Sequence, residues 1–219
     1  MNYLSHFYVH QKDEDPMYSL GLILPDISRG FVKVPGKLNK DEYLSFMPLA
    51  QGCLQHYMAD KQFHSSHFFK WGSQVCTEIL KDAPFEGEVN RRWFMGHVLF
   101  EMLLDRIIVN HQPMVAEHFY QELSAISLAR LKDFVILHPH QDIEKFLHIF
   151  HHFRSAAYIK NYPDNNIFAF SLSRIMKKAG LPELSLSNKI VLQECVWELE
   201  NNDFKNVQSV LFQLKEVFN

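Results

Sequence analysis

Glycine, proline and cysteine are all scarce in this chain. Its 219 residues include only 8 glycines and 9 prolines, which favours helices with short connections over a fold rich in turns. The three cysteines, Cys53, Cys76 and Cys195, are far apart, and no Cys-x-x-Cys pair occurs. The sequence therefore predicts neither a disulfide framework nor a zinc site built from cysteines.

An excess of positive charge and a long apolar run are also missing. Lysine and arginine number 22 against 25 aspartates and glutamates, so the net charge is −3 and we expect no nucleic-acid partner. No apolar stretch is long enough to span a bilayer, and the first residues lack the basic and apolar regions of a secretion signal. We therefore expect a soluble protein of the cytoplasm.

Apolar residues make up 47% of the chain, and much of their spacing is helical. Strand signals are weak and no repeat or linker interrupts the sequence, so the pattern predicts an all-α, single-domain helical bundle over residues 1–219. Helices are expected at 2–11, 42–70 with a bend near Pro48, 89–110, 114–134, 142–162, 164–179, 186–200 and 203–218.

Two of the expected helices carry a polar line on an otherwise largely apolar surface. The lines consist of His56, Asp60 and His64 in one helix, and of His97, Glu101 and Asp105 in the other. Residues four apart share one face of a helix, so each line points in one direction. A carboxylate buried alone costs several kcal/mol, roughly the net stability of a domain, so these side chains need partners.

Two arrangements would give the polar side chains of these lines the partners that they need. One consists of ordinary hydrogen bonds and salt bridges between helices, with Glu101 or Asp105 paired to an arginine. The other is a divalent metal shared by facing helices, which is a common way for helical folds to build a metal site. Imidazole and carboxylate suit zinc, manganese, iron or magnesium. Because two such lines occur, we favour one or two ions held by His56, Asp60, His97 and Glu101.

Several segments resemble the acyl carrier protein phosphodiesterase family, in the same order along the chain. They are MNYLSH at the start, SLGLILPDISRG at 19–30, GCLQHYMAD at 52–60 and YIKNYPDNNIFAFSLSRIMKKAG at 158–180. That family is helical and related to HD-type metal-dependent phosphohydrolases. The resemblance implies an HD-like fold, a divalent metal such as manganese, and removal of 4′-phosphopantetheine from acyl carrier protein. It also implies that His6 and Asp26 are metal ligands.

A second family is similar at overlapping segments. Residues 52–64, GCLQHYMADKQFH, and residues 96–101, GHVLFE, resemble zinc-dependent phospholipase C-like proteins, which carry Gly-x-x-x-His-x3-Asp-x3-His and His-x3-Glu. Both resemblances imply a metal-dependent phosphoester hydrolase, and they differ in the substrate and in the metal, which is manganese, iron or zinc. Tyr57 and Met58 stand where the first family carries two arginines, the natural clamp for a phosphate.

The sequence thus leads to a hypothesis of phosphodiester hydrolysis. A bound divalent ion would lower the pKa of a water molecule, and His64 is the candidate for moving a proton. Arg29 is the candidate clamp for the phosphate, and an ordinary surface arginine is the alternative. Two other functions stay open: a non-catalytic helical domain that holds a metal or a polar core, and a module that docks an acidic carrier protein without cutting it.

Overall fold

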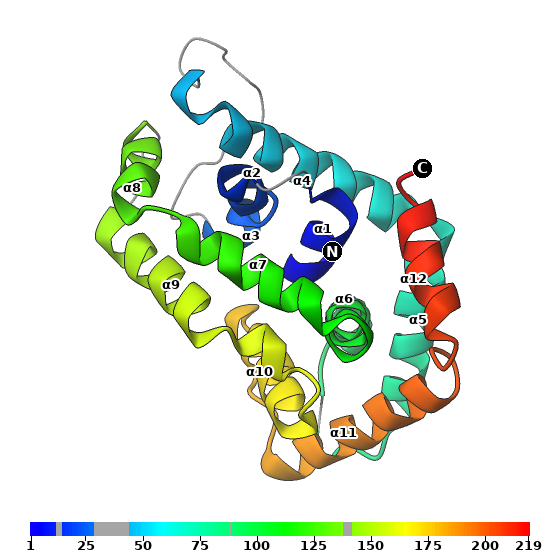
Figure 1. Cartoon of the computed structure of the whole chain (residues 1–219). Coiled ribbons are helices and arrows are strands. Elements are labelled where there is room, and N and C mark those ends of the chain that lie inside the picture. Colours follow the sequence, from blue (N-terminus) through cyan, green and yellow to red (C-terminus); the bar gives the residue numbers. More distant parts are fainter. Residues whose placement is uncertain (12–14, 29–43, 88, 138–141) are drawn as a thin grey trace. The chain divides into compact units, whose positions relative to one another are not determined.

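The computed structural model describes residues 1–11, 15–28, 44–87, 89–137 and 142–219. Within these ranges the chain forms twelve α-helices and two short 3₁₀ helices, and no strand (Figure 1). The all-α prediction is therefore confirmed. Among the same residues no helix combines the length and the apolar character that crossing a membrane requires.

The described chain divides into two compact units, and each combines two stretches that are separated in the sequence. Unit 1 contains Met1–Lys61 and Gln112–Lys160, and unit 2 contains Gln62–His111 and Asn161–Asn219. The single-domain organisation and the HD-like character stay predictions.

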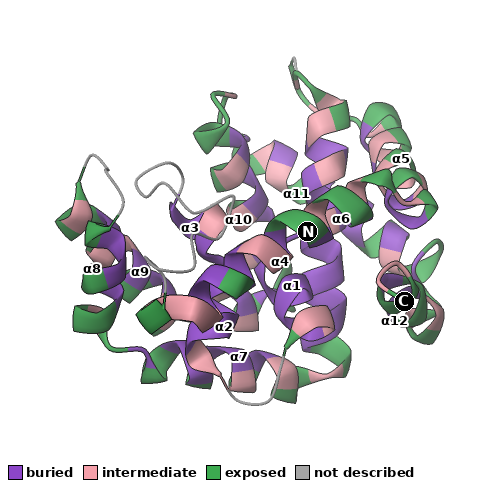
Figure 2. Ribbon diagram, turned by 90° about the horizontal axis from the view of Figure 1, so that it is seen from above, coloured by how far each residue is buried: buried purple, intermediate pink, exposed green. Residues whose placement is uncertain are grey.

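Unit 1 is built around the short N-terminal helices and the first part of a long one. Its helices are α1 (Tyr3–His10), α2 (Pro16–Gly21), α3 (Leu24–Ser28), η1 (Leu44–Phe46), most of α4 (Met47–Ser65), α7 (Pro113–Ala125), α8 (Leu128–Ile136) and α9 (Ile143–Ala156). Residues Tyr3 to Tyr8 of α1 are all buried, as Figure 2 shows. His6, in the middle of this stretch, is therefore buried inside the unit.

Unit 2 contains the helices that follow the end of α4 and those of the C-terminal part. They are α5 (His67–Asp82), α6 (Arg92–His111), α10 (Asn165–Lys178), α11 (Leu186–Asn201) and α12 (Val207–Glu216). The short helix η2 (Tyr158–Asn161) precedes α10, and its residues up to Lys160 belong to unit 1. Helices α5 and α6 pack closely, because a Cβ atom on Gly72 would lie 2.2 Å from the ring of Phe100. Residues 97–109 of α6 are almost all buried, which agrees with its apolar sequence.

Two serines divide segments for which the sequence predicted single helices. The expected helix at 42–70 is broken at Ser66, whose hydroxyl accepts a hydrogen bond from the Phe69 amide and caps α5. Pro48 does not bend it, because it lies in the first turn of α4, where proline is tolerated. The expected helix at 114–134 is likewise divided into α7 and α8, and Ser127 caps α8. A serine that caps a helix is hard to recognise in the sequence when the helical spacing of apolar residues continues on both sides of it.

A close contact between two glycines sets the position of α4 against α2. A Cβ atom added to Gly52 would lie 2.3 Å from the carbonyl oxygen of Tyr18 and 2.8 Å from Cα of Gly21. Only glycine permits this approach of the two backbones. One helical turn after Gly52, His56 reaches the carbonyl of Leu22, the residue that follows Gly21, so the close approach of the two glycines places His56.

Candidate metal centres

The structure gathers two groups of side chains whose ligand atoms lie within 4.8 Å of one another. The first group, in unit 1, consists of His6, His56 and Asp60, and the second, in unit 2, consists of His64, His97 and Glu101. Every member of both groups except His6 comes from one of the two polar lines of the sequence.

In the first group Asp60 faces both histidines. Its Oδ1 lies 3.1 Å from Nε2 of His6, and its Oδ2 lies 3.5 Å from Nε2 of His56. The two imidazole rings stack with their centroids 4.2 Å apart. Asp26 adds a second carboxylate, with its Oδ1 3.7 Å from Nε2 of His56. Two ligands of one tetrahedral ion with bonds of about 2.0–2.2 Å lie about 3.3–3.6 Å apart, so the 3.5 Å contact of Asp60 with His56 matches this spacing and the other two contacts would have to adjust by a few tenths of an ångström.

The orientation of His56 is fixed by a backbone atom. Its Nδ1 lies 2.8 Å from the carbonyl oxygen of Leu22, the residue that ends α2. A carbonyl only accepts, so Nδ1 carries the hydrogen, and in the neutral ring Nε2 presents a lone pair. That lone pair faces the carboxylates of Asp26 and Asp60. A cation or a proton is required between them, and the Nδ1–H···O=C bond is the support that metal-bound histidines commonly have.

His6 is completely buried, and neither of its ring nitrogens makes a well-aligned hydrogen bond. Burial strongly disfavours the charged imidazolium, and although contact with Asp60 opposes this effect, the pKa of His6 falls to about 3. The ring is therefore neutral at pH 7. A neutral imidazole whose Nε2 faces a carboxylate could exchange that contact for a shared metal ion.

Asp60 remains ionised in the same place. Burial alone would raise its pKa, but the His6 contact and the positive charge of the Met1 amino group outweigh burial and hold the pKa below its ordinary value. The nitrogen of Met1 lies 2.7 Å from Oδ1 of Asp60. The carboxylate thus offers a full negative charge and already attracts a cation.

The second group also centres on one carboxylate. Oε1 of Glu101 lies 2.9 Å from Nε2 of His64 and 3.1 Å from Nε2 of His97. Burial would raise the pKa of Glu101, yet its pKa is held well below its usual range, and hydrogen bonds from both histidines contribute. The ring of Phe69 packs edge-on against both imidazoles, with centroids 4.7 and 4.8 Å away, and so fixes their orientation.

The predicted ligands are thus distributed over the two groups. His6, His56 and Asp60 come together with Asp26 beside them, and His97 and Glu101 come together with His64, for which the sequence suggested a catalytic role. One ion shared between the two polar lines stays a prediction. Asp105, the last member of the second polar line, is completely buried. Arg29, the predicted phosphate clamp, lies outside the described residues.

Unit 1 also contains a histidine–carboxylate pair that was not predicted from the sequence. Nε2 of His118 lies 3.0 Å from Oε1 of Glu122, which is only 5% exposed. A signal was present, because these residues on α7 repeat the His-x3-Glu spacing of His97 and Glu101. No sequence pattern indicates that the Leu22 carbonyl orients His56, since every residue carries the same backbone oxygen.

Comparisons with protein-family models, with characterised proteins and with solved structures gave no match. The two family resemblances therefore rest on the quoted segments alone.

Acid should destabilise the metal-free protein through His6. The unfolded chain protonates this histidine below about pH 6.5, whereas the folded protein resists protonation until pH falls to about 3. The unfolded state binds more protons across this window, so we expect the free energy of unfolding to fall by about 2–3 kcal/mol between pH 7 and pH 4.5. Urea denaturation of chelator-treated protein at both pH values measures the change. The loss should shrink in His6→Gln and persist in His111→Gln, which alters an exposed histidine.

Proposed function

We propose that this chain is a metal-dependent phosphoester hydrolase with a divalent ion at His6, His56 and Asp60. The observation that carries the proposal is the fixed orientation of His56, whose Nε2 faces two carboxylates while its Nδ1 bonds to Leu22. An ion bound by Nε2 and these carboxylates would leave the Nδ1–H···O=C bond to Leu22 in place, which is the support that metal-bound histidines commonly have. Buried Nε2 of His6 points to the same carboxylate.

A bound ion would supply Lewis acidity, lowering the pKa of a coordinated water and offsetting negative charge on a phosphate. The protein's own contribution is placement. His6 and His56 are buried, and each would offer a ring nitrogen to the ion. Asp60 would supply the negative charge. Asp26, 37% exposed, is the carboxylate nearest to solvent and is suited to accept a proton from an attacking water.

We propose a second ion at His64, His97 and Glu101. This group has the two-imidazole, one-carboxylate composition of many transition-metal sites, and an ion there would replace the hydrogen-bond contacts of 2.9 and 3.1 Å that Glu101 makes with the two histidines. All three side chains are partly exposed, at 35%, 31% and 16%, so an ion there would keep a position open to a ligand. His64 then acts as a ligand rather than as a proton carrier.

Two observations bear on the class of substrate. The resemblance of the N-terminal segments supports acyl carrier protein bearing 4′-phosphopantetheine. Next to His56, however, α4 exposes Tyr57 and Met58, at 43% and 64%, and neither is a cation. Recognition of a highly charged phosphate at these two positions is therefore not expected, and a phosphoester with an apolar or uncharged group is favoured there.

The proposal is tested by metal analysis combined with turnover. Protein purified without chelator, and protein reloaded with manganese, iron or zinc, should contain at least about one ion per chain and hydrolyse bis-p-nitrophenyl phosphate. Holo-acyl carrier protein, assayed in parallel, tests the substrate implied by the resemblance. Protein that binds no metal under any of these conditions would remove the basis of the proposal.

A non-catalytic helical domain is the second candidate, and one observation favours it. The Met1 amino group compensates the charge of Asp60 at 2.7 Å without any metal. Under this alternative the polar cluster contributes to folding only. Stoichiometric metal without turnover, or no metal and unchanged stability after chelation, would favour it.

A further inference from the structure

One face of α11, in unit 2, carries large apolar side chains that lie in contact with solvent. Leu186, Ile190 and Trp197 are 77%, 51% and 64% exposed. At about 100° per residue they fall within about 40° of one another around the helix, so they form one apolar stripe along it. The opposite face packs inside the unit and consists of Asn188, Leu192, Cys195, Val196 and Leu199. Aligned apolar side chains on the outer face of a helix are a feature of interaction surfaces.

The apolar surface continues from the stripe onto α10, which packs against α11. Phe170 of α10 is 49% exposed, and the centre of its ring lies 5.6 Å from Nζ of Lys189. Gln193 lies within the stripe, and its amide donates to Asn166 of α10 at 3.1 Å. The polar group in the stripe is therefore satisfied inside unit 2, and a partner would have to cover mainly apolar atoms.

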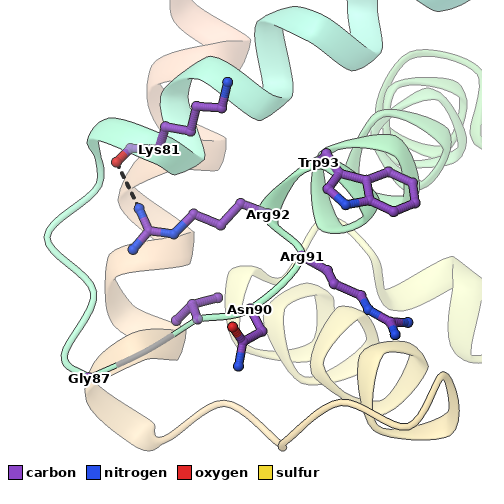
Figure 3. Close-up of a pocket in the computed structure, with 7 residues that line it drawn as sticks. Lys81, Gly87, Asn90, Arg91, Arg92 and Trp93 are labelled. Atoms are coloured by element: carbon purple, nitrogen blue, oxygen red, sulfur yellow. Dashed lines mark hydrogen bonds between the residues drawn. The ribbon is translucent and has the colours of Figure 1, made fainter.

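The first turn of α11 is fixed to the segment that follows α5. The side-chain oxygen of Asn188 accepts a hydrogen bond from the Glu86 amide at 2.8 Å, and Nδ2 of Asn188 donates to the Glu86 carbonyl at 3.0 Å. Figure 3 shows Gly87, the next residue, close to the start of α11, whose ribbon is pale orange. Ser185 caps the same turn. Because the helix is already held in place, binding a partner through the stripe would cost little ordering.

Two residues of opposite charge border the stripe. Lys189 lies about 70° to one side of it and Glu194 about 70° to the other. When two such helices pair in parallel, unlike flanks meet, so Lys189 would face the partner's Glu194. When they pair in antiparallel, like flanks meet, and these two charges stay apart. Lys189 is available for such a contact, because its contact with Glu183 is long, at 3.6 Å, and Glu183 also binds Lys177 at 2.8 Å.

We propose that α11 pairs in parallel with α11 of a second copy of this chain, about a two-fold axis that runs along the stripe. Leu186, Ile190 and Trp197 would pack against the same three residues of the other copy. Two ion pairs, each between Lys189 and the partner's Glu194, would border this apolar centre. Apolar residues at the seam with opposite charges on its flanks are the arrangement of a two-stranded coiled coil, here about two heptads long. The candidate metal centres take no part, so the inference does not rest on the proposed function.

Sedimentation equilibrium of the full chain between about 1 and 500 µM tests the pairing, and the wild type should approach twice the mass of one chain. Ile190→Glu should raise the dissociation constant of the dimer about tenfold or more, because it places two carboxylates against each other in an apolar contact. Phe212→Glu is the matched control. It makes a similar change at a side chain of α12 that is 63% exposed, and it should leave the dimer intact.

Exchange of charges tests the parallel direction. Lys189→Glu or Glu194→Lys alone would bring like charges together and should weaken the dimer about threefold or more, whereas Lys189→Glu/Glu194→Lys should restore it. Ile190→Cys should also form an intermolecular disulfide under mild oxidation, because position 190 faces itself across the two-fold axis. Phe212→Cys should not. The native cysteines are all buried, so they leave the result of this cross-linking unaffected.

A chain that stays monomeric throughout the concentration range would overturn the inference, and so would equal dimerisation of Ile190→Glu and the wild type. Equal weakening by Phe212→Glu would show that the contact lies elsewhere or is unspecific. Failure of the double charge exchange to restore the dimer, or of Ile190→Cys to cross-link, would contradict the parallel pairing. Circular dichroism of each variant separates a lost dimer from a lost fold.

Discussion

Replacing Asp60 by asparagine should remove metal and hydrolysis together while the helices stay intact. The substitution keeps the volume and deletes the charge that faces both His6 and His56. Loss of an outer-shell partner alone typically costs about 10–100-fold in metal affinity or activity, so loss of the central carboxylate should lower kcat/KM at least about 100-fold. Metal analysis and turnover of bis-p-nitrophenyl phosphate, measured on one preparation, give both quantities.

Asp82→Asn provides the matched control, because Asp82 is an exposed aspartate at the end of α5. It makes the same change of charge and should retain metal and turnover. Circular dichroism separates a lost site from a lost fold. If Asp60→Asn binds metal and turns over like the control, Asp60 is not the ligand that the geometry suggests, and the polar cluster is structural.

The spacing of polar residues foretold which side chains of each helix act together. Because residues four apart lie on one helix face, His56 joined Asp60 and His97 joined Glu101 without any tertiary information. The all-α fold followed in the same way from apolar periodicity. These features are local, and local patterns are what a single sequence encodes most directly.

What the sequence could not supply were the partners across helices. His64 follows Asp60 by four residues, yet it bonds to Glu101, because Ser66 ends α4 just after it and α6 packs against α5. The contact of His6 with Asp60 depends on the burial of a whole short helix. Contacts of this kind are set by the packing of distant segments, and helix spacing carries no information on them.

Replacing Arg106 by alanine should destabilise the protein more than a typical substitution. Arg106 is 5% exposed and uses its whole guanidinium. Its Nε and Nη2 donate to the two carboxylate oxygens of Glu200 at 2.7 and 3.0 Å, its Nη1 donates to the Tyr162 carbonyl, and Nη2 also donates to Asn165. Removing one partner of a largely buried ion pair leaves the other charge uncompensated, which costs about 3–5 kcal/mol. Chemical denaturation measures this loss.

Three further variants show whether the loss of stability in Arg106→Ala comes from the charge, from the hydrogen-bond geometry or from the unpaired glutamate. Arg106→Lys keeps the charge but cannot form the planar fork, so it should fall between the wild type and alanine. Glu200→Gln should cost less than Arg106→Ala, because Glu200 is 23% exposed and the arginine keeps its bonds to Tyr162 and Asn165. Arg106→Met combined with Glu200→Leu should recover much of the loss, since apolar replacement of both partners removes the unpaired charge. A cost below about 1 kcal/mol for Arg106→Ala would mean that water replaces the guanidinium, and that α6, α10 and α11 are held together by their apolar contacts alone.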